Sequence, residues 1–358
     1  MTSKGWFHTE ITNTAKKLAF EALSTSDLTN GSNTIELEKE IKRILGVETA
    51  IYTNSGTSAL SMSLLSAGIG KGQTVATSGI GWIATVQAAK FTGADVLLID
   101  VEKDLPKLDL DQLENARDKF DALISVNYNG RQLNTKKIKK ILNGKVLIED
   151  SCKSLLSRDY KGISFSGTNS NFGCFSLGMI SMIPGIYGGF IVSNNLNDYD
   201  DLKCLKWHGT SYSSNKEEYK KCSYNFKTSN IHASIALGML ENYKERIAKL
   251  ELIYAMYEEG LKNLENNKLL TVKVDDGEIP LLIDIVSKNR AETITKFKEK
   301  NLPTCNYHES LGKAYYTKSF TELKCSSFFG SSVFHPPCGP DQDLKAIEQS
   351  ISLLRSLG

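Results

Sequence analysis

The chain has 358 residues, of which 41% are hydrophobic and 23% are charged, and its formal net charge is only +2. That length leaves room for two domains around a substantial apolar core. The near-neutral charge, without a clustered basic stripe, argues against a nucleic-acid-binding protein.

Seven cysteines are scattered singly along the sequence, without a C-x-x-C pair to hold zinc or to run redox chemistry. They are typical of reduced thiols in a cytoplasmic protein. The N-terminus lacks the apolar core of a signal peptide, and no stretch approaches the ~20 apolar residues of a membrane helix. We therefore expect a soluble cytoplasmic protein with no membrane insertion and no metal site.

Short β-rich runs alternate with helical patterns over the first half of the chain. The expected strands are residues 74–78, 95–101, 122–128, 145–151, 174–177 and 190–193, and the expected helices include residues 58–67, 81–91 and 134–142. Such alternation is typical of right-handed crossovers and a mostly parallel sheet that is buried on both faces. The sequence therefore predicts an α/β fold that binds its ligand at the carboxyl ends of the strands.

The pattern changes after about residue 228. Residues 229–265 are expected to form one long helical segment that bridges two domains, because apolar residues recur there at helical spacing. A strand at residues 279–286 and helices at 290–300 and 341–357 follow. We predict a large domain over residues 1–240, with an N-terminal arm, and a smaller α+β domain over residues 241–358.

Three loops carry candidate chemistry. In the first, Gly56, Thr57 and Ser58 open a helix whose N-terminus suits an anionic phosphate, although a simple N-cap is the commoner role of such hydroxyls. In the second, Trp82 could stack on a ring or belong to the core. In the third, Asp150 ends an apolar strand and could either pair with a protonated pyridine nitrogen or cap a helix.

Taken in order, these loops belong to a longer series of motifs: S-G-T-S-A-L, G-W-I-A-T, I-E-D-S, Y-K-G with G-C-F-S-L-G-M, G-G-F-I-V-S-N and Y-N-F-K-T-S-N. The series resembles the DegT/DnrJ/EryC1/StrS family of sugar aminotransferases from about Gly31 to Ser234, and more loosely to the C-terminus. The resemblance implies fold type I, the aspartate aminotransferase-like fold. Its large domain has a mostly parallel, seven-stranded-type sheet between helices.

The resemblance also implies pyridoxal 5'-phosphate or pyridoxamine 5'-phosphate as cofactor and a nucleotide-linked sugar as substrate. The residues that match its cofactor site are Gly56, Thr57 and Ser58 with Ser176 at the phosphate, Trp82 on the ring face and Asp150 at the ring nitrogen. Asn225 matches an asparagine that reaches the phosphate in the neighbouring subunit. A homodimer with shared active sites is therefore expected.

One position departs sharply from the family. Between Ser176 and the glycines 188–189 the alignment needs no gap, and the position of the catalytic lysine is occupied by Ser181. No lysine occurs between Lys161, in the Y-K-G turn, and Lys203. A serine cannot form a Schiff base and is a poor base at neutral pH, so we expect a non-covalently held cofactor and absent or very slow transamination.

Lys153 is a second departure, since the family usually has glutamine there, near the cofactor's phenolic oxygen. It could stabilise the phenolate or supply a displaced amine, or it could point to solvent from a helix start, and we prefer the last interpretation. Ile186 and Tyr187 replace smaller and more polar residues, which indicates a reshaped site.

The histidines add less. His208, in an H-G turn, matches a family position near the substrate, and His308 falls in a segment that could approach the site. Together with Lys153 they are the candidates for a replacement base. His232 is expected in the core, and His335 in a C-terminal loop.

Three functions remain open. The first is an aminotransferase that acts on a keto sugar, with another lysine in the missing role. The second is a lysine-free, pyridoxamine-phosphate-dependent sugar dehydratase, although such relatives have histidine where this chain has Ser181. The third is a catalytically inactive homologue that acts as a binding or partner subunit.

Overall fold

The computed structural model describes residues 4–159, 162–213, 216–270 and 277–358. Tyr160 and Lys161, which begin the expected Y-K-G turn, lie outside the described residues. Among the helices of the described part, none has both the length and the apolar character needed to cross a bilayer.

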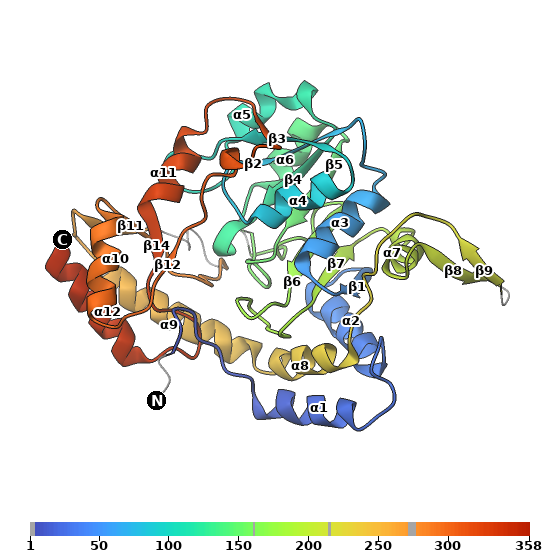
Figure 1. Ribbon diagram of the computed structural model, residues 1–358, viewed down its shortest axis with the longest axis horizontal. Helices are drawn as coiled ribbons and strands as arrows, with labels where there is room; N and C mark the ends of the chain where they lie inside the picture. Colours follow the sequence, from blue (N-terminus) through green and yellow to red (C-terminus); the bar gives the residue numbers. More distant parts are fainter. Residues whose placement is uncertain (1–3, 160–161, 214–215, 271–276) are drawn as a thin grey trace.

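One large sheet forms the centre of the structure (Figure 1). Its strands follow the order β1-β7-β6-β5-β4-β2-β3-β13. They are β1 (Thr49–Thr53), β2 (Thr74–Ser78), β3 (Asp95–Ile99), β4 (Ala122–Val126), β5 (Val146–Asp150), β6 (Phe172–Ser176), β7 (Gly189–Ser193) and β13 (Lys318–Ser319). Only β7 breaks the parallel run, being antiparallel to both β1 and β6. The predicted mostly parallel, seven-stranded-type sheet is confirmed, and the short β13 extends it.

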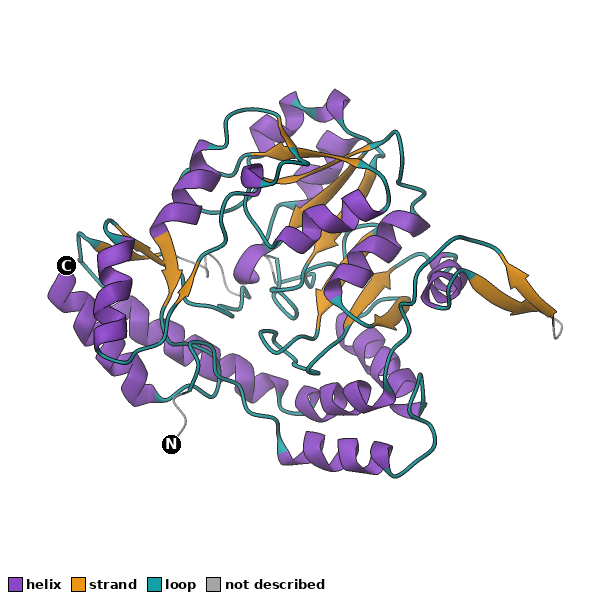
Figure 2. Ribbon diagram, viewed as in Figure 1, coloured by secondary structure: helices purple, strands orange, loops and turns teal. Residues whose placement is uncertain are grey.

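Helices cover both faces of this sheet (Figure 2). On one face α3 (Gly56–Ser66) and α4 (Ile83–Phe91) pack against Val75 and Ile124, and on the other α5 (Leu110–Asn115) and α6 (Thr135–Leu142) pack against Ala76 and Leu123. Successive residues of a strand point to opposite faces, so each strand supplies both cores. This explains why β1, β4 and β7 are buried at every residue.

The expected single helix over residues 229–265 is wrong, because the chain forms α8 (Asn230–Leu240) and then α9 (Tyr243–Gly260). The backbone leaves the helical conformation at Asn242, where φ is −105° and ψ is 18°. The two helices have different partners: α8 packs on α1 (Asn13–Leu23) and α2 (Ser32–Leu45), whereas α9 packs on α12 (Leu344–Leu357). A side chain on Gly238 would come within 2.4 Å of Ala15, so glycine permits the close approach of α8 to α1.

The C-terminal part contains a second, antiparallel sheet in the order β10-β11-β14-β12. Its strands are β10 (Asn267–Leu269), β11 (Ile285–Ser287), β12 (Cys305–Asn306) and β14 (Val333–His335), beside α10 (Arg290–Glu299) and α11 (Lys324–Ser332). The strand expected at residues 279–286 forms only at its end. Before β11 the backbone instead pairs with a side chain, since the N–H of Leu282 donates to Asn129 at 2.6 Å.

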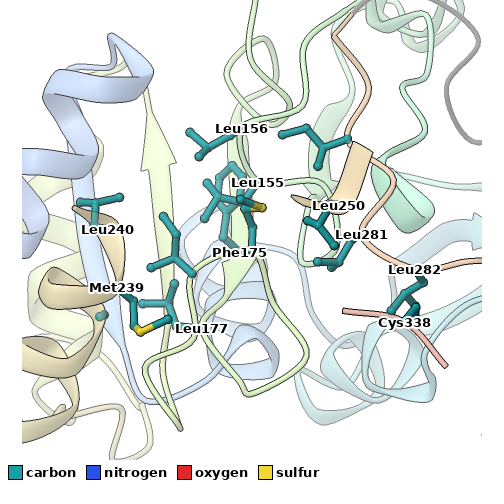
Figure 3. Close-up of a cluster of buried hydrophobic side chains, with 14 of the residues drawn as sticks. Leu155, Leu156, Phe175, Leu177, Met239, Leu240, Leu250, Leu281, Leu282 and Cys338 are labelled. Carbon is teal, nitrogen blue, oxygen red and sulfur yellow. The ribbon is translucent and has the colours of Figure 1, made fainter. Parts of the chain in front are cut away.

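Segments far apart in sequence join the two parts. Leu281 and Leu282, which precede β11, lie with Phe175 of β6 and with Leu177 in one buried cluster (Figure 3). The N-terminal arm runs along the C-terminal part, where Trp6 accepts a hydrogen bond of 2.6 Å from the N–H of Cys338. In Figure 1 the hairpin of β8 (Thr210–Ser213) and β9 (Lys216–Tyr219) projects outward beyond α7 (Asp198–Lys206). The predicted domain boundary after residue 240 stays a prediction.

Candidate active site

A cavity of about 300 Å³ lies at the carboxyl ends of the central strands, where doubly wound sheets bind their ligands. Trp82 after β2, Asn127 after β4, Asp150 at the end of β5 and Ser176 at the end of β6 line one wall. The opposite wall comes from Trp6 of the N-terminal arm and from residues 305, 306, 308 and 335 of the C-terminal part. The cavity therefore lies between the large sheet and the smaller one.

The start of α3 faces this cavity. Ser55 is the N-cap residue, and its hydroxyl accepts from the N–H of Ser58 at 3.0 Å. Gly56 and Thr57 line the cavity at the helix N-terminus, whose first N–H groups have no partner within the helix. A side chain on Gly56 would come within 2.8 Å of the Cys152 sulfur, so the tight packing there requires glycine. A helix start of this kind favours an anion such as a phosphate.

Asp150 presents a buried carboxylate to the same cavity, with only 7% of the residue exposed. The Thr85 hydroxyl donates to one of its oxygens at 2.7 Å, and the N–H of Cys152 donates to the other at 3.2 Å. Burial and the neighbouring Asp150 charge raise the pKa of the Cys152 thiol well above its usual range. Asp150 is thus available as the anionic partner of a protonated ring nitrogen, and Cys152 is a neutral thiol.

Trp82 and His308 approach each other from the two walls. Their ring centroids lie 5.0 Å apart, although Trp82 remains 59% exposed in this chain. Burial, reinforced by electrostatic interactions with His335 and Lys153, lowers the pKa of His308 to about 4. His308 is therefore a neutral imidazole at physiological pH, beside an aromatic face that a flat ring could cover.

Lys153 lies inside the cavity, so the prediction that it points to solvent is wrong. The residues after β5 form turns rather than a helix start, and the lysine side chain is directed inward. Its amine donates a hydrogen bond to the backbone carbonyl of Ile180. Burial lowers the pKa of Lys153 to about 8, against the opposing influence of Cys152 and Asp150.

Ser181 follows Ile180 but does not line the cavity. The residue is 1% exposed, and its hydroxyl has no hydrogen-bond partner within the described part of the chain. Ile186 and Tyr187, expected to reshape the site, are 36% and 67% exposed and also lie outside the lining of the cavity. In a single chain these two residues therefore do not close it.

Three further predicted site residues are not brought to this cavity. The Ser58 hydroxyl bonds back to Asn54 and lies 2.9 Å from the Ser55 hydroxyl. His208 is exposed, with a left-handed backbone (φ 63°), at the turn before β8. Asn225 is exposed beside that hairpin, and its carbonyl accepts from Asn54 at 3.0 Å. His232 is only half-buried, not in the core, with its ring centroid 5.8 Å from that of Tyr187.

A buried charged cluster behind the second wall was missed by sequence reasoning. Asp284 accepts from Arg131 at 2.5 Å and lies 3.1 Å from Nδ1 of His335, which itself lines the cavity. Burial alone would raise the pKa of Asp284, but the Arg131 and His335 contacts outweigh it and lower the pKa to about 2. A charged residue within the apolar run 279–286 was the available signal, because an aspartate is rarely buried without a partner.

These residues fit a flat, phosphorylated ring with a basic nitrogen. The α3 N-terminus with Thr57 and Ser176 suits the phosphate, Trp82 offers a ring face, and Asp150 offers a held carboxylate. A cavity of about 300 Å³ is at the lower end of the usual range for small-molecule sites. Lys153 and His308 add two groups that can exchange protons near neutral pH or below.

Comparison with known proteins agrees with this description. The family model for the DegT/DnrJ/EryC1/StrS aminotransferase family matches residues 9–355, which extends the resemblance well beyond the motifs between Gly31 and Ser234. GDP-perosamine synthase of Escherichia coli O157:H7 is 26% identical over 263 residues, covering 72% of this chain and 71% of that protein.

Two solved structures have the same fold. Helicobacter pylori PseC, an aminotransferase involved in the biosynthesis of pseudoaminic acid, superposes with a TM-score of 0.92 at 19% identity, and the match covers 99% of both chains. An E. coli GDP-4-keto-6-deoxy-D-mannose-3-dehydratase with bound hydrated PLP gives a TM-score of 0.89 at 17% identity, covering 99% of this chain and 100% of that one.

Proposed function

This chain belongs to the DegT/DnrJ/EryC1/StrS aminotransferase family, and from that premise we propose that it binds pyridoxal or pyridoxamine phosphate and acts on a nucleotide-linked keto sugar. The observation that carries the proposal is the convergence of Thr57, Asp150 and Ser176 on one cavity at the strand ends. The name of its relative GDP-perosamine synthase supports a nucleotide-linked sugar as substrate.

The bound cofactor supplies a cationic ring that withdraws electrons from the reacting carbon. The chain's own residues hold and orient that ring. Asp150, fixed by Thr85, would face the ring nitrogen and favour its protonated form, and Trp82 would cover one face of the ring. The N-terminus of α3 neutralises the phosphate, and the second wall, with His308 and His335, limits the access of water.

We propose that residue 181 forms no covalent bond with the cofactor and that non-covalent contacts hold the pyridoxamine form. A serine cannot form a Schiff base, and the Ser181 side chain is buried outside the cavity lining. The pyridoxamine form suits such a site, because it carries its own amine. Replacement of the keto oxygen by that amine is the reaction we favour. Removal of a sugar hydroxyl is the second candidate, since a 3-dehydratase has the same fold. A binding role without catalysis is the third.

The assembly we propose is a cytoplasmic homodimer with shared sites. Asn225 lies exposed beside the projecting hairpin and outside its own chain's cavity, as a residue that serves a neighbouring subunit would. All seven cysteines are free thiols, which suits a reducing compartment.

Calorimetric titration with each form of the cofactor tests the proposal. We expect both forms to bind, and Asp150→Ala to weaken binding by ~10-fold or more, since it removes a charge-assisted contact. Asp121→Ala is the matched control, because the Asp121 carboxylate caps the exposed start of β2 at Thr74. If neither pyridoxal phosphate nor pyridoxamine phosphate binds, the proposal is contradicted.

The reaction is tested by incubating the pyridoxamine-phosphate-loaded protein with GDP-4-keto-6-deoxy-D-mannose and following the sugar by mass spectrometry. Exchange of a carbonyl oxygen for an amino group identifies the aminotransferase, and loss of a hydroxyl identifies the dehydratase. An unchanged sugar together with tight cofactor binding would point to the binding role, or to a different sugar, which a panel of nucleotide-linked keto sugars resolves.

A further inference from the structure

Lys153 combines three features that a structural lysine does not need. It lies three residues beyond Asp150 on the same loop, it lines the cavity, and its amine reaches the carbonyl of Ile180. Ile180 directly precedes Ser181, the position that corresponds to the family's catalytic lysine. Lys153 follows β5, whereas Ile180 and Ser181 follow β6. The Lys153 amine therefore contacts the backbone next to the residue from which the family's lysine would extend.

The environment of this amine differs from that of two other lysines with little exposure, Lys206 and Lys107. Lys206 is 3% exposed and pairs with Glu38 at 3.3 Å, and Lys107 pairs with the buried Glu278 at the same distance. Within the described residues no carboxylate lies within ion-pairing distance of the Lys153 amine, whose hydrogen bond goes to a neutral carbonyl. A cation held in this way gains little Coulomb energy against its desolvation cost.

We propose that Lys153 is the amine that bonds to the aldehyde of pyridoxal phosphate, in place of residue 181. This inference rests on the proposed function, because it requires the cofactor to occupy the cavity. The neutral amine attacks the aldehyde carbon and a C=N bond forms, while the aldehyde oxygen leaves as water with the two amine protons. No oxidant or further reactant is needed, and the pyridoxamine form, which has no aldehyde, stays non-covalently bound.

The protonation state of Lys153 supports this role. Its pKa of about 8, lowered chiefly by burial, leaves a substantial fraction of the amine neutral at slightly alkaline pH. A lysine that is deprotonated by desolvation is the usual form of a nucleophilic amine. The titratable groups around it are Asp150 and Cys152, which oppose the lowering of its pKa, and His308, whose own pKa is lowered to about 4.

The test uses the full-length protein loaded with pyridoxal phosphate, reduced with borohydride, digested and examined by peptide mass spectrometry. We expect a phosphopyridoxyl group on Lys153 at about one per chain, and an absorption band near the visible edge that borohydride removes. Lys153→Gln should lose both the band and the label. Lys206→Gln, the buried lysine outside the cavity, should keep both.

Binding of pyridoxamine phosphate separates this inference from the proposed function. Lys153→Gln should bind that form within ~3-fold of the unaltered protein, yet bind pyridoxal phosphate ~10-fold or more weakly. If pyridoxal phosphate binds but no lysine is labelled, or another lysine carries the label, the inference about Lys153 is overturned and the proposed function stands. If neither form binds, the proposed function fails and this inference fails with it.

Discussion

The Thr85 hydroxyl donates a hydrogen bond of 2.7 Å to the Asp150 carboxylate, which joins the first turns of α4 to the end of β5. Both residues are buried, at 1% and 7% exposure. A second donor, the N–H of Cys152, holds the other carboxylate oxygen. The carboxylate that we assign to the ring nitrogen is thus fixed in place by the protein before any ligand arrives.

Thr85→Val removes one of these two donors while keeping the shape of the side chain. We expect cofactor affinity to fall by ~10-fold. A hydrogen bond to a charged group contributes roughly 1.5–3 kcal/mol, and other contacts of the Asp150 carboxylate will replace part of that energy. Thr92→Val is the matched control, since the Thr92 hydroxyl donates to the Ala89 carbonyl at the end of α4, away from Asp150. Equal affinity of Thr85→Val and the unaltered protein in calorimetry would show that Thr85 does not position Asp150.

The placement of Asn225 leads to a prediction about assembly. If Asn225 completes the phosphate site of a second subunit, the protein should be a stable dimer, and light scattering should give about twice the 39.6 kDa chain mass. Asn225→Ala should lower cofactor affinity by ~10-fold while leaving the dimer intact. A monomer at micromolar concentration, with cofactor present, would contradict the shared site.

Lys153 should make stability depend on pH. Its pKa in the folded chain, about 8, lies below the ordinary 10.5. Between these values the unfolded chain binds a proton that the folded chain does not, so the free energy of unfolding rises with pH over that window. Below pH 8 the folded protein bears the full cost of a buried ammonium group.

Lys153→Met should therefore raise the free energy of unfolding by on the order of 2 kcal/mol at neutral pH. The gain should shrink as pH rises from 8 to 10.5. Urea denaturation on both sides of pH 8 measures it, and Lys288→Met, at an exposed lysine, is the control that should show no such trend. A gain that stays constant with pH would mean that the amine is solvated in the folded protein.

Asp100 ties the end of the large sheet to the C-terminal part. Its buried carboxylate accepts from the N–H groups of Cys325 and Ser326 at 2.9 and 2.8 Å, and from the Ser326 hydroxyl at 2.6 Å, at the start of α11. Asp100→Ala would leave these buried donors unpaired and should cost roughly 2–4 kcal/mol of stability.

Asp109→Ala provides the comparison for Asp100→Ala in the same urea melts. Asp109 caps α5 by accepting from the N–H groups of Asp111 and Gln112, both at 3.0 Å, at a more exposed helix start. We expect it to cost about 1 kcal/mol. If Asp100→Ala and Asp109→Ala lower the free energy of unfolding by the same amount, Asp100 acts as an ordinary helix cap and does not link the large sheet to the C-terminal part.

Local patterns in the sequence predicted much of the fold. The strand at residues 74–78 agrees with β2 residue for residue, because a short run with β-branched residues between two glycines is a local signal. The break between α8 and α9 has no glycine or proline to mark it. It arises because the two helices pack on different partners, which only the tertiary structure specifies.

The candidate site also contains some residues that the sequence could predict and some contacts that it could not. Gly56, Trp82, Asp150 and Ser176 could be placed because each follows a strand, and strand ends meet in space. The direction of the Lys153 side chain and the meeting of residues 131, 284 and 335 depend on turns and long-range packing. Sequence spacing carries no information about those contacts.

Ser181 gives the last prediction. Lysine at this position must fit into a site that is 1% exposed, between Ile180 and the buried Met182, so Ser181→Lys should cost roughly 1–3 kcal/mol through overpacking. Even so, Ile180 itself lines the cavity, and a long side chain can extend from the next residue into it. We therefore expect Ser181→Lys combined with Lys153→Gln to regain the absorption band that Lys153→Gln alone loses, with the borohydride label now on residue 181. If the double variant binds pyridoxamine phosphate but regains no band, then the packing around Met182 prevents a lysine side chain at residue 181 from reaching the cofactor. Ile186 and Tyr187 cannot be the cause within one chain, because neither of them lines the cavity.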